Sequence, residues 1–294
     1  MDGVGELFGQ SVDAVLRRPR AALVPFVVDV VFLAVGTTLF LWLAGESLFF
    51  PQGYRLPNFP MAVPHALPTV GDVMGPTPDV HALGVPVLAA AAILVLALVP
   101  LLAYAEAGFL GVLRAVYLDE ADPLAEGRHR DAWSRVREAF ADTGRRHFVP
   151  FLALRGVQAG LALAALFVPL AFPGAPSYSL GVLSIDLLLL YAPYAVVDRR
   201  VGALSAIRES VQLVSDHLAS TLVALLFGLL VTGGISLLTT PLALLLGPAG
   251  PFVASALYAP FGTILALFLY KVYRSFRPQE AMPEAVPAPH AVPA

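Results

Sequence analysis

Four polar residues lie inside long apolar stretches of this sequence, where such side chains are costly to bury. Asp29 lies about seven residues into the first stretch, and Arg155 lies at the same depth in the third, with Gln158 one helical turn further on. Asp186 lies deep in the fourth. Ionisable groups at such depth usually face the interior of a helix bundle and pair with one another. The spacing therefore predicts a structural salt bridge between Asp29 and Arg155.

Two other interpretations of Asp29 and Arg155 stay open. The pair could line a cavity that opens to the cytoplasm, or Arg155 could extend to the lipid headgroups while Asp29 caps a neighbouring helix. Asp186 has no basic residue at its depth, so we expect hydrogen bonds to hydroxyl or backbone groups such as Ser184, with a proton relay as the alternative. Glu106 lies at the inner end of the second stretch, where we expect an ordinary hydrated carboxylate.

Prolines and glycines occur within the apolar stretches at positions that shape helices. Three prolines are expected to kink their helices: Pro100, Pro193 and Pro260. Such breaks could open a central crevice, as in transporters, although packing is the simpler explanation. Gly156 and Gly160 form a GxxxG pattern, and a glycine pair at 233–234 interrupts the fifth stretch. We expect close helix contacts at both places.

Several classes of chemistry are excluded by the residue types. The chain has no cysteine, and it contains no metalloprotease, serine-hydrolase, P-loop or dinucleotide-binding motif. Four possible ligands between the first two stretches are too irregularly spaced to predict a metal site: His65, Asp72, Asp79 and His81. The net charge of −3, without a basic run interleaved with aromatics, argues against a nucleic-acid partner. We therefore expect no catalytic residues, no metal and no cofactor.

The elements that must position these residues are membrane-spanning helices. Of the 294 residues, 58% are hydrophobic and 13% are charged, whereas soluble domains have about 25% charged residues. A bilayer core about 30 Å thick needs roughly 20 apolar residues in a helix. Six stretches have that length: 22–44, 84–105, 148–172, 178–197, 218–240 and 251–272. The first is too long, and its leader too acidic, for a cleaved signal peptide.

The basic residues assign a direction to these six stretches. Cytoplasmic loops of membrane proteins are enriched in Lys and Arg. Sixteen of the 18 Lys and Arg residues lie on the side that would be cytoplasmic, if Lys271 at the inner end of the sixth stretch is counted with the segment after it. Arg55 lies on the other side, and Arg155 lies within the third stretch. The sequence thus predicts an all-α polytopic fold with six transmembrane helices and both termini in the cytoplasm. Arginine in place of lysine at nearly every basic position indicates GC-rich coding, and hence a bacterial inner membrane.

Each outward-going stretch follows a short amphipathic segment. Apolar residues recur every three or four positions within 4–15, 133–140 and 204–214, and we expect Gly144 to end the second of these helices. The segments RRPRAALVPFVVD and GRRHFVPFLALR also share basic residues followed by V-P-F. This similarity predicts three hairpins, each preceded by a cytoplasmic amphipathic helix. A common need for arginine before any outward span is the other explanation, because the third copy lacks V-P-F.

The segment VVDRRVGALSAIRESVQLVSDHLASTLVALL carries a family resemblance. One span ends in Asp198, a helix follows with Ala206 and Ser210 four positions apart, and His217 opens the next span. Together with the ending ALFLYKVYRSF, this pattern resembles a group of uncharacterised six-span bacterial proteins related to the membrane domain of some glycerophosphoryl diester phosphodiesterases. The resemblance covers nearly the whole chain and implies fold and location. These 294 residues include no phosphodiesterase catalytic domain, and no functional residues can be carried over.

These observations predict one membrane domain and a function outside catalysis. The domain spans 1–275, with a Pro-rich external loop at 45–83 and a disordered cytoplasmic tail at 276–294. We expect a non-enzymatic integral membrane protein in envelope or lipid homeostasis, whose partners are membrane lipids and either another protein or a second copy of the chain. A small-solute permease or transporter subunit is the first alternative, and an intramembrane enzyme acting on lipid is the second.

Overall fold

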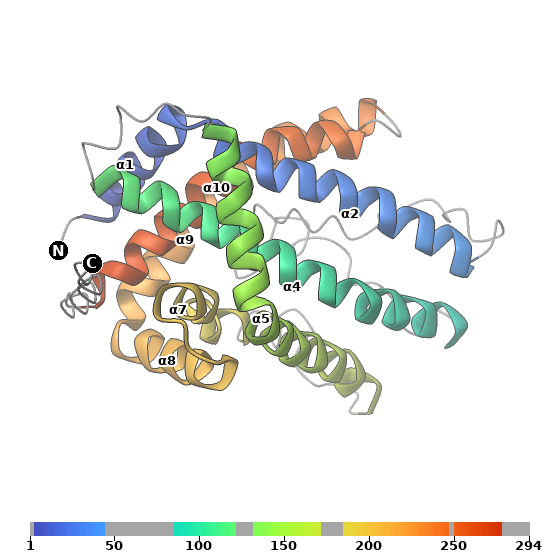
Figure 1. The fold of residues 1–294 in the computed structure, drawn as a ribbon. Helices are drawn as coiled ribbons and strands as arrows, with labels where there is room; N and C mark the ends of the chain where they lie inside the picture. Colours follow the sequence, from blue (N-terminus) through green and yellow to red (C-terminus); the bar gives the residue numbers. More distant parts are fainter. Residues whose placement is uncertain (1–2, 45–84, 122–131, 172–184, 247–249, 278–294) are drawn as a thin grey trace, which may run out of the picture.

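The protein is a bundle of α-helices, shown in Figure 1. Its structure is a computed structural model that describes residues 3–44, 85–121, 132–171, 185–246 and 250–277, and no strand occurs in those ranges. The helices are α1 (Val4–Arg17), α2 (Arg20–Ala44), α4 (Val85–Ala121), α5 (Ala132–Ala171), α7 (Ala192–Arg199), α8 (Ala203–Asp216), α9 (Leu218–Leu245) and α10 (Gly250–Ser275). The predicted external loop, and the predicted tail beyond its first two residues, lie outside the described residues.

Three helices in the described ranges are long and apolar enough to cross a membrane. The candidate spans are Leu98–Leu118 in α4, Leu218–Thr239 in α9 and Phe252–Ser275 in α10, with mean hydropathies of 1.5, 2.3 and 1.9. Lipid offers backbone groups no hydrogen-bond partner, so segments of this composition must satisfy their backbone internally, as a helix does. The chain is therefore an all-helical protein with membrane-spanning character.

The centre of the bundle is α10. Every residue of this helix from 262 to 273 is buried, which is the pattern of a helix surrounded on all sides. The short helix α1 packs against it: the Phe8 ring centroid lies 5.9 Å from that of Phe268 on α10 and 4.8 Å from that of Phe227 on α9. Leu7 and Val15 of α1 are buried as well. The start of α1 thus lies at the same end of the bundle as the end of α10 (Figure 1).

The long helices α4 and α5 cross in close contact, and glycines make this possible. A Cβ added at Gly108 would lie 2.6 Å from Cδ2 and 2.8 Å from the carbonyl oxygen of Phe140, and one at Gly144 would lie 3.0 Å from the Tyr104 ring. The prediction that Gly144 ends a short helix was wrong. The helix runs on through it, because a glycine in this position lets α5 approach α4.

We expect Gly108→Ala to lower the free energy of unfolding by about 1–3 kcal/mol, because the added methyl meets backbone that cannot move aside. Gly156→Ala is the matched control: no atom lies within 4 Å of its Cβ position, which also corrects the close contact predicted at Gly156 and Gly160. Alanine there is expected to stabilise the helix by about 0.5–1 kcal/mol. Unfolding in mixed micelles measures both, and equal effects of the two changes would contradict the close crossing.

The fourth predicted span is broken at residues 189–191. A short helical turn covers 185–188, and α7 begins at Ala192. Pro193 explains the break, since it has no N–H for the carbonyl of Leu189 and its ring crowds that carbonyl. Ser210 of α8 fills the gap: its hydroxyl donates to the Leu188 carbonyl at 2.7 Å and accepts the Tyr191 N–H at 3.0 Å.

Replacing Ser210 by alanine would remove the hydroxyl that serves both the buried Tyr191 N–H and the part-buried Leu188 carbonyl. We expect Ser210→Ala to lower the free energy of unfolding by about 1–3 kcal/mol. Ser215→Ala is the control on the same helix, because the Ser215 hydroxyl is exposed and, among the residues that the structure describes, bonds only to Val211 of its own helix. A change within about 0.5 kcal/mol is therefore expected. Loss of amide protection at Tyr191 in hydrogen exchange should accompany only the first change.

Candidate functional site

Arg155 forms its ion pair with Glu106 of α4 and not with Asp29, which was the predicted partner. The Nε atom of Arg155 donates to one carboxylate oxygen and a terminal nitrogen pairs with the other, so the contact is bidentate. Both side chains are largely buried, with exposed fractions of 9% and 14%. The prediction failed because α5 packs extensively along α4 and only slightly against α2.

Two more of the predicted polar residues join this pair. The Gln158 side-chain oxygen accepts a hydrogen bond from Nη1 of Arg155, one helical turn away. Asp186 lies near enough to Arg155 to interact with its charge, which corrects the expectation that it has no basic neighbour. We call Glu106, Arg155, Gln158 and Asp186 the inner polar cluster. The sequence placed Glu106 at the inner end of its apolar stretch, about seven residues shallower than Arg155, and this position suggested hydration instead of an ion pair.

The other predicted site residues lie on separate helices. Asp29 is on α2 and is 2% exposed. Helices α4 and α10 continue through Pro100 and Pro260, and only Pro193 coincides with an interrupted helix. Pro193 therefore differs from Pro100 and Pro260, and the break beside it is filled by a hydroxyl of the neighbouring helix.

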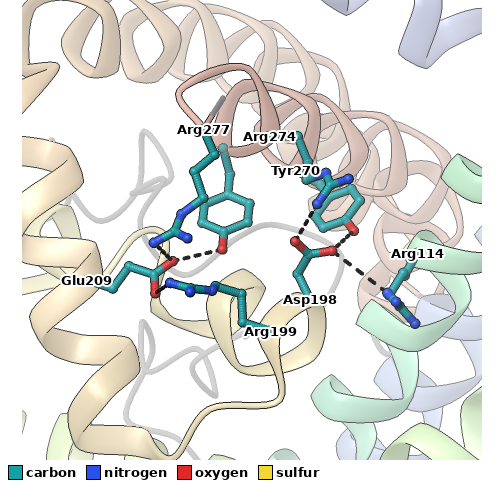
Figure 2. A network of polar contacts seen from close by, with 8 residues as sticks. Arg114, Asp198, Arg199, Glu209, Tyr270, Arg274 and Arg277 are labelled. Carbon is teal, nitrogen blue, oxygen red and sulfur yellow. Dashed lines mark hydrogen bonds and ion pairs between the residues drawn. The ribbon is translucent and has the colours of Figure 1, made fainter. Parts of the chain in front are cut away.

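A second set of charged residues, not singled out from the sequence, lies where α4, α7, α8 and the end of α10 meet (Figure 2). Asp198 accepts a hydrogen bond from the Tyr270 hydroxyl at 2.8 Å and another from Nη1 of Arg274 at 2.7 Å. Nε of Arg114 is 3.8 Å from the same carboxylate. The Asp198 side chain is 9% exposed, so these partners replace the water that it would otherwise bind.

Glu209 of α8 repeats this arrangement about one turn further along α10 (Figure 2). Its carboxylate accepts from the Tyr273 hydroxyl at 2.9 Å and pairs with Arg277 at 2.6 Å and Arg199 at 3.1 Å. We call these eight residues the ionic latch: Arg114, Asp198, Arg199, Glu209, Tyr270, Tyr273, Arg274 and Arg277. The sequence did carry a signal, since YKVYRSFR places a tyrosine and an arginine four positions apart twice, and so on one helix face.

The latch ties the end of α10 to α7 and α8. Phe276 stacks on His217 at a centroid distance of 4.3 Å, so this residue and Arg277 are packed and do not belong to the predicted tail.

Beside Glu209 lies a cavity of about 270 Å³, whose charged lining comes from Arg199, Glu209, Asp216 and Arg277. Each carboxylate of the ionic latch is held by a phenol and by arginines, an arrangement suited to holding helices together.

Comparisons with protein-family models, with curated proteins and with solved structures found no match. The family resemblance noted in the sequence stays a prediction.

Proposed function

We propose that this chain is a six-span protein of a bacterial inner membrane that acts without catalysis in envelope or lipid homeostasis, through contact with membrane lipids. The proposal includes both termini in the cytoplasm and three hairpins preceded by amphipathic helices, as in the family that the sequence resembles. Sixteen basic residues in alternate segments support this direction.

The observation that carries the proposal is the surface of α9, where large apolar side chains are exposed and polar ones are buried. Large apolar side chains of this helix are exposed along its length: Leu222, Val223, Leu226, Leu230, Leu237 and Leu238. The hydroxyls of Thr221 and Thr232 are buried instead and bond to Tyr191 and to the carbonyl of Gly228. Such a surface would promote aggregation in water, whereas acyl chains suit it.

The proposed direction can be tested directly, because the chain has no cysteine to interfere with labelling. An impermeant maleimide should label Ser47→Cys in intact cells and Ser215→Cys only after the membrane is opened. Ser47 belongs to the predicted external loop and Ser215 to α8. Labelling of both in intact cells, or of neither, would overturn the six-span arrangement.

Lipid contact is tested by native mass spectrometry of the protein released from detergent. We expect phospholipid to remain bound and its removal to lower the melting temperature. A protein that emerges free of lipid and equally stable would contradict a lipid-based function.

A permease or transporter subunit is the second candidate, and the inner polar cluster favours it. Charged groups buried within a membrane bundle often line a solute path. A permease requires water to reach Glu106 and Arg155, so Gln158→Cys should react with a small hydrophilic thiol reagent from the cytoplasmic side. Protection of that thiol would support the lipid-based function instead.

A further inference from the structure

The cavity of about 270 Å³ beside the ionic latch is lined by charged groups of both signs, which come from three helices. Arg199 from the end of α7 and Arg277 from the end of α10 lie at one part of it, and both pair with Glu209. Gln212 and Asp216, further along α8, complete the polar lining. The cavity therefore offers donors and acceptors to one and the same ligand.

Arg277 supplies a donor that the ionic latch does not use. Its Nη2 pairs with Glu209 at 2.6 Å, but its Nε is buried without a hydrogen-bond acceptor among the described residues. Both oxygens of Glu209 are already engaged, one by Arg277 and the Tyr273 hydroxyl and the other by Arg199. A buried donor without a partner is uncommon, and it indicates that a bound group or water accepts its hydrogen bond.

Asp216 supplies the opposite charge. It lies seven residues after Glu209 on α8, which places it on the same helix face and about 10 Å further along the axis. Its side chain is exposed and forms no ion pair or hydrogen bond with another described residue. A simple anion at the arginines would be repelled by this carboxylate, whereas a ligand that also carries a cation would be attracted to it.

The cavity lies where a candidate span ends. The span Phe252–Ser275 is followed directly by Phe276 and Arg277, and both of these residues line the cavity. The end of a membrane-spanning helix lies at the level of the lipid headgroups. A volume of 270 Å³ holds roughly nine water molecules, which is enough space for a phosphate with a short amine arm.

We propose that this cavity binds a phosphoethanolamine group, carried either by phosphatidylethanolamine or by free phosphoethanolamine. The phosphate accepts hydrogen bonds from Arg199 and Arg277, since guanidinium groups match phosphate oxygens. The ammonium donates to Asp216 and to the amide oxygen of Gln212. Two carbons separate the two charges, and a hydrogen bond of about 2.8 Å at each end extends the ligand between Arg277 and Asp216. Only the lipid source rests on the proposed function, because it names the lipid that is bound.

The test compares Asp216→Asn with Asp13→Asn in the full chain. Both substitutions keep the shape of an exposed side chain and remove one negative charge, and Asp13 of α1 has no ion pair among the described residues. Both variants should therefore melt like the parent without ligand. Native mass spectrometry measures which lipid is retained from detergent that contains equal amounts of phosphatidylethanolamine and phosphatidylglycerol. Melting in lipid-free detergent measures the response to free phosphoethanolamine.

We expect the parent and Asp13→Asn to retain phosphatidylethanolamine over phosphatidylglycerol at least about tenfold, and Asp216→Asn to lose this preference. That result assigns the site to the lipid headgroup. A melting temperature raised by phosphoethanolamine in the parent but not in Asp216→Asn, without a lipid preference, assigns the site to the free compound. Equal responses of the two variants, or no response of the parent to either probe, would overturn the site.

Failure of this site and failure of the proposed function can be told apart. Phospholipid retained without a headgroup preference, together with no response to phosphoethanolamine, would overturn the site and leave the lipid-based function intact. Stabilisation by phosphoethanolamine of a protein that emerges free of lipid would support the site and contradict the lipid-based function.

Discussion

Replacing Arg155 by methionine is expected to lower the free energy of unfolding by about 3–5 kcal/mol. The reason is that Glu106 stays behind as a buried carboxylate whose bidentate partner has gone. Methionine keeps much of the volume of the arginine stem, so lost packing adds little. Equilibrium unfolding in mixed micelles measures the loss.

A double-mutant cycle separates this pair from the one predicted by sequence spacing. Because Glu106→Gln removes the stranded charge, the double variant Glu106→Gln with Arg155→Met should be no less stable than Arg155→Met alone. Asp29→Asn is the comparison, and its effect should add to that of Arg155→Met within about 0.5 kcal/mol. Additivity for Glu106 together with strong coupling for Asp29 would refute the assignment made from the structure.

The second large effect is expected for Asp198→Asn. The substitution keeps the shape of the side chain but removes the charge that holds Arg274, at 2.7 Å, and the Tyr270 hydroxyl, at 2.8 Å. Hydrogen bonds to charged groups contribute about 1.5–3 kcal/mol, and we expect a loss near 2 kcal/mol because Arg274 is one-third exposed and partly screened by solvent.

Asp142→Asn is the matched control for Asp198→Asn. Asp142 pairs with Arg146 at 2.8 Å, four residues along the same helix, but both side chains are more than half exposed. Pairs of this kind contribute about 0.3–0.5 kcal/mol. The ionic latch predicts a several-fold larger loss for Asp198→Asn, together with faster hydrogen exchange at the end of α10. Similar losses of unfolding free energy for the two substitutions would show that the ionic latch stabilises the protein no more than an exposed surface pair does.

Apolar composition was enough to predict the helices, because an apolar segment becomes helical for reasons that lie within the segment itself. A segment such as α9, with a mean hydropathy of 2.3, satisfies its own backbone and needs no distant partner to be helical. The same holds for the break before α7, since the sequence placed Pro193 inside a predicted span. Local chemistry did not reveal that Ser210, from a different helix, would fill that break.

Glycines show how a local pattern can mislead. Gly156 and Gly160 have the spacing of a close helix contact, yet nothing lies within 4 Å of their Cβ positions. The close crossing occurs instead at Gly108, against Phe140, and at Gly144, against Tyr104. The spacing of small residues permits an approach between helices, but the crossing of α4 and α5 decides which glycines are used.

The sequence by itself favoured an acidic partner for Arg155, because ionisable groups at that depth usually pair with one another. It offered Asp29 at the same depth and Glu106 nearer the inner end of its stretch. Only the tertiary structure decided between them, since depth along a helix is a property of spacing, whereas the facing helix depends on how α5 turns and crosses its neighbours. The ionic latch arises in the same way: two Tyr–Arg pairs can be seen in YKVYRSFR, but packing brings Asp198 and Glu209 to meet them.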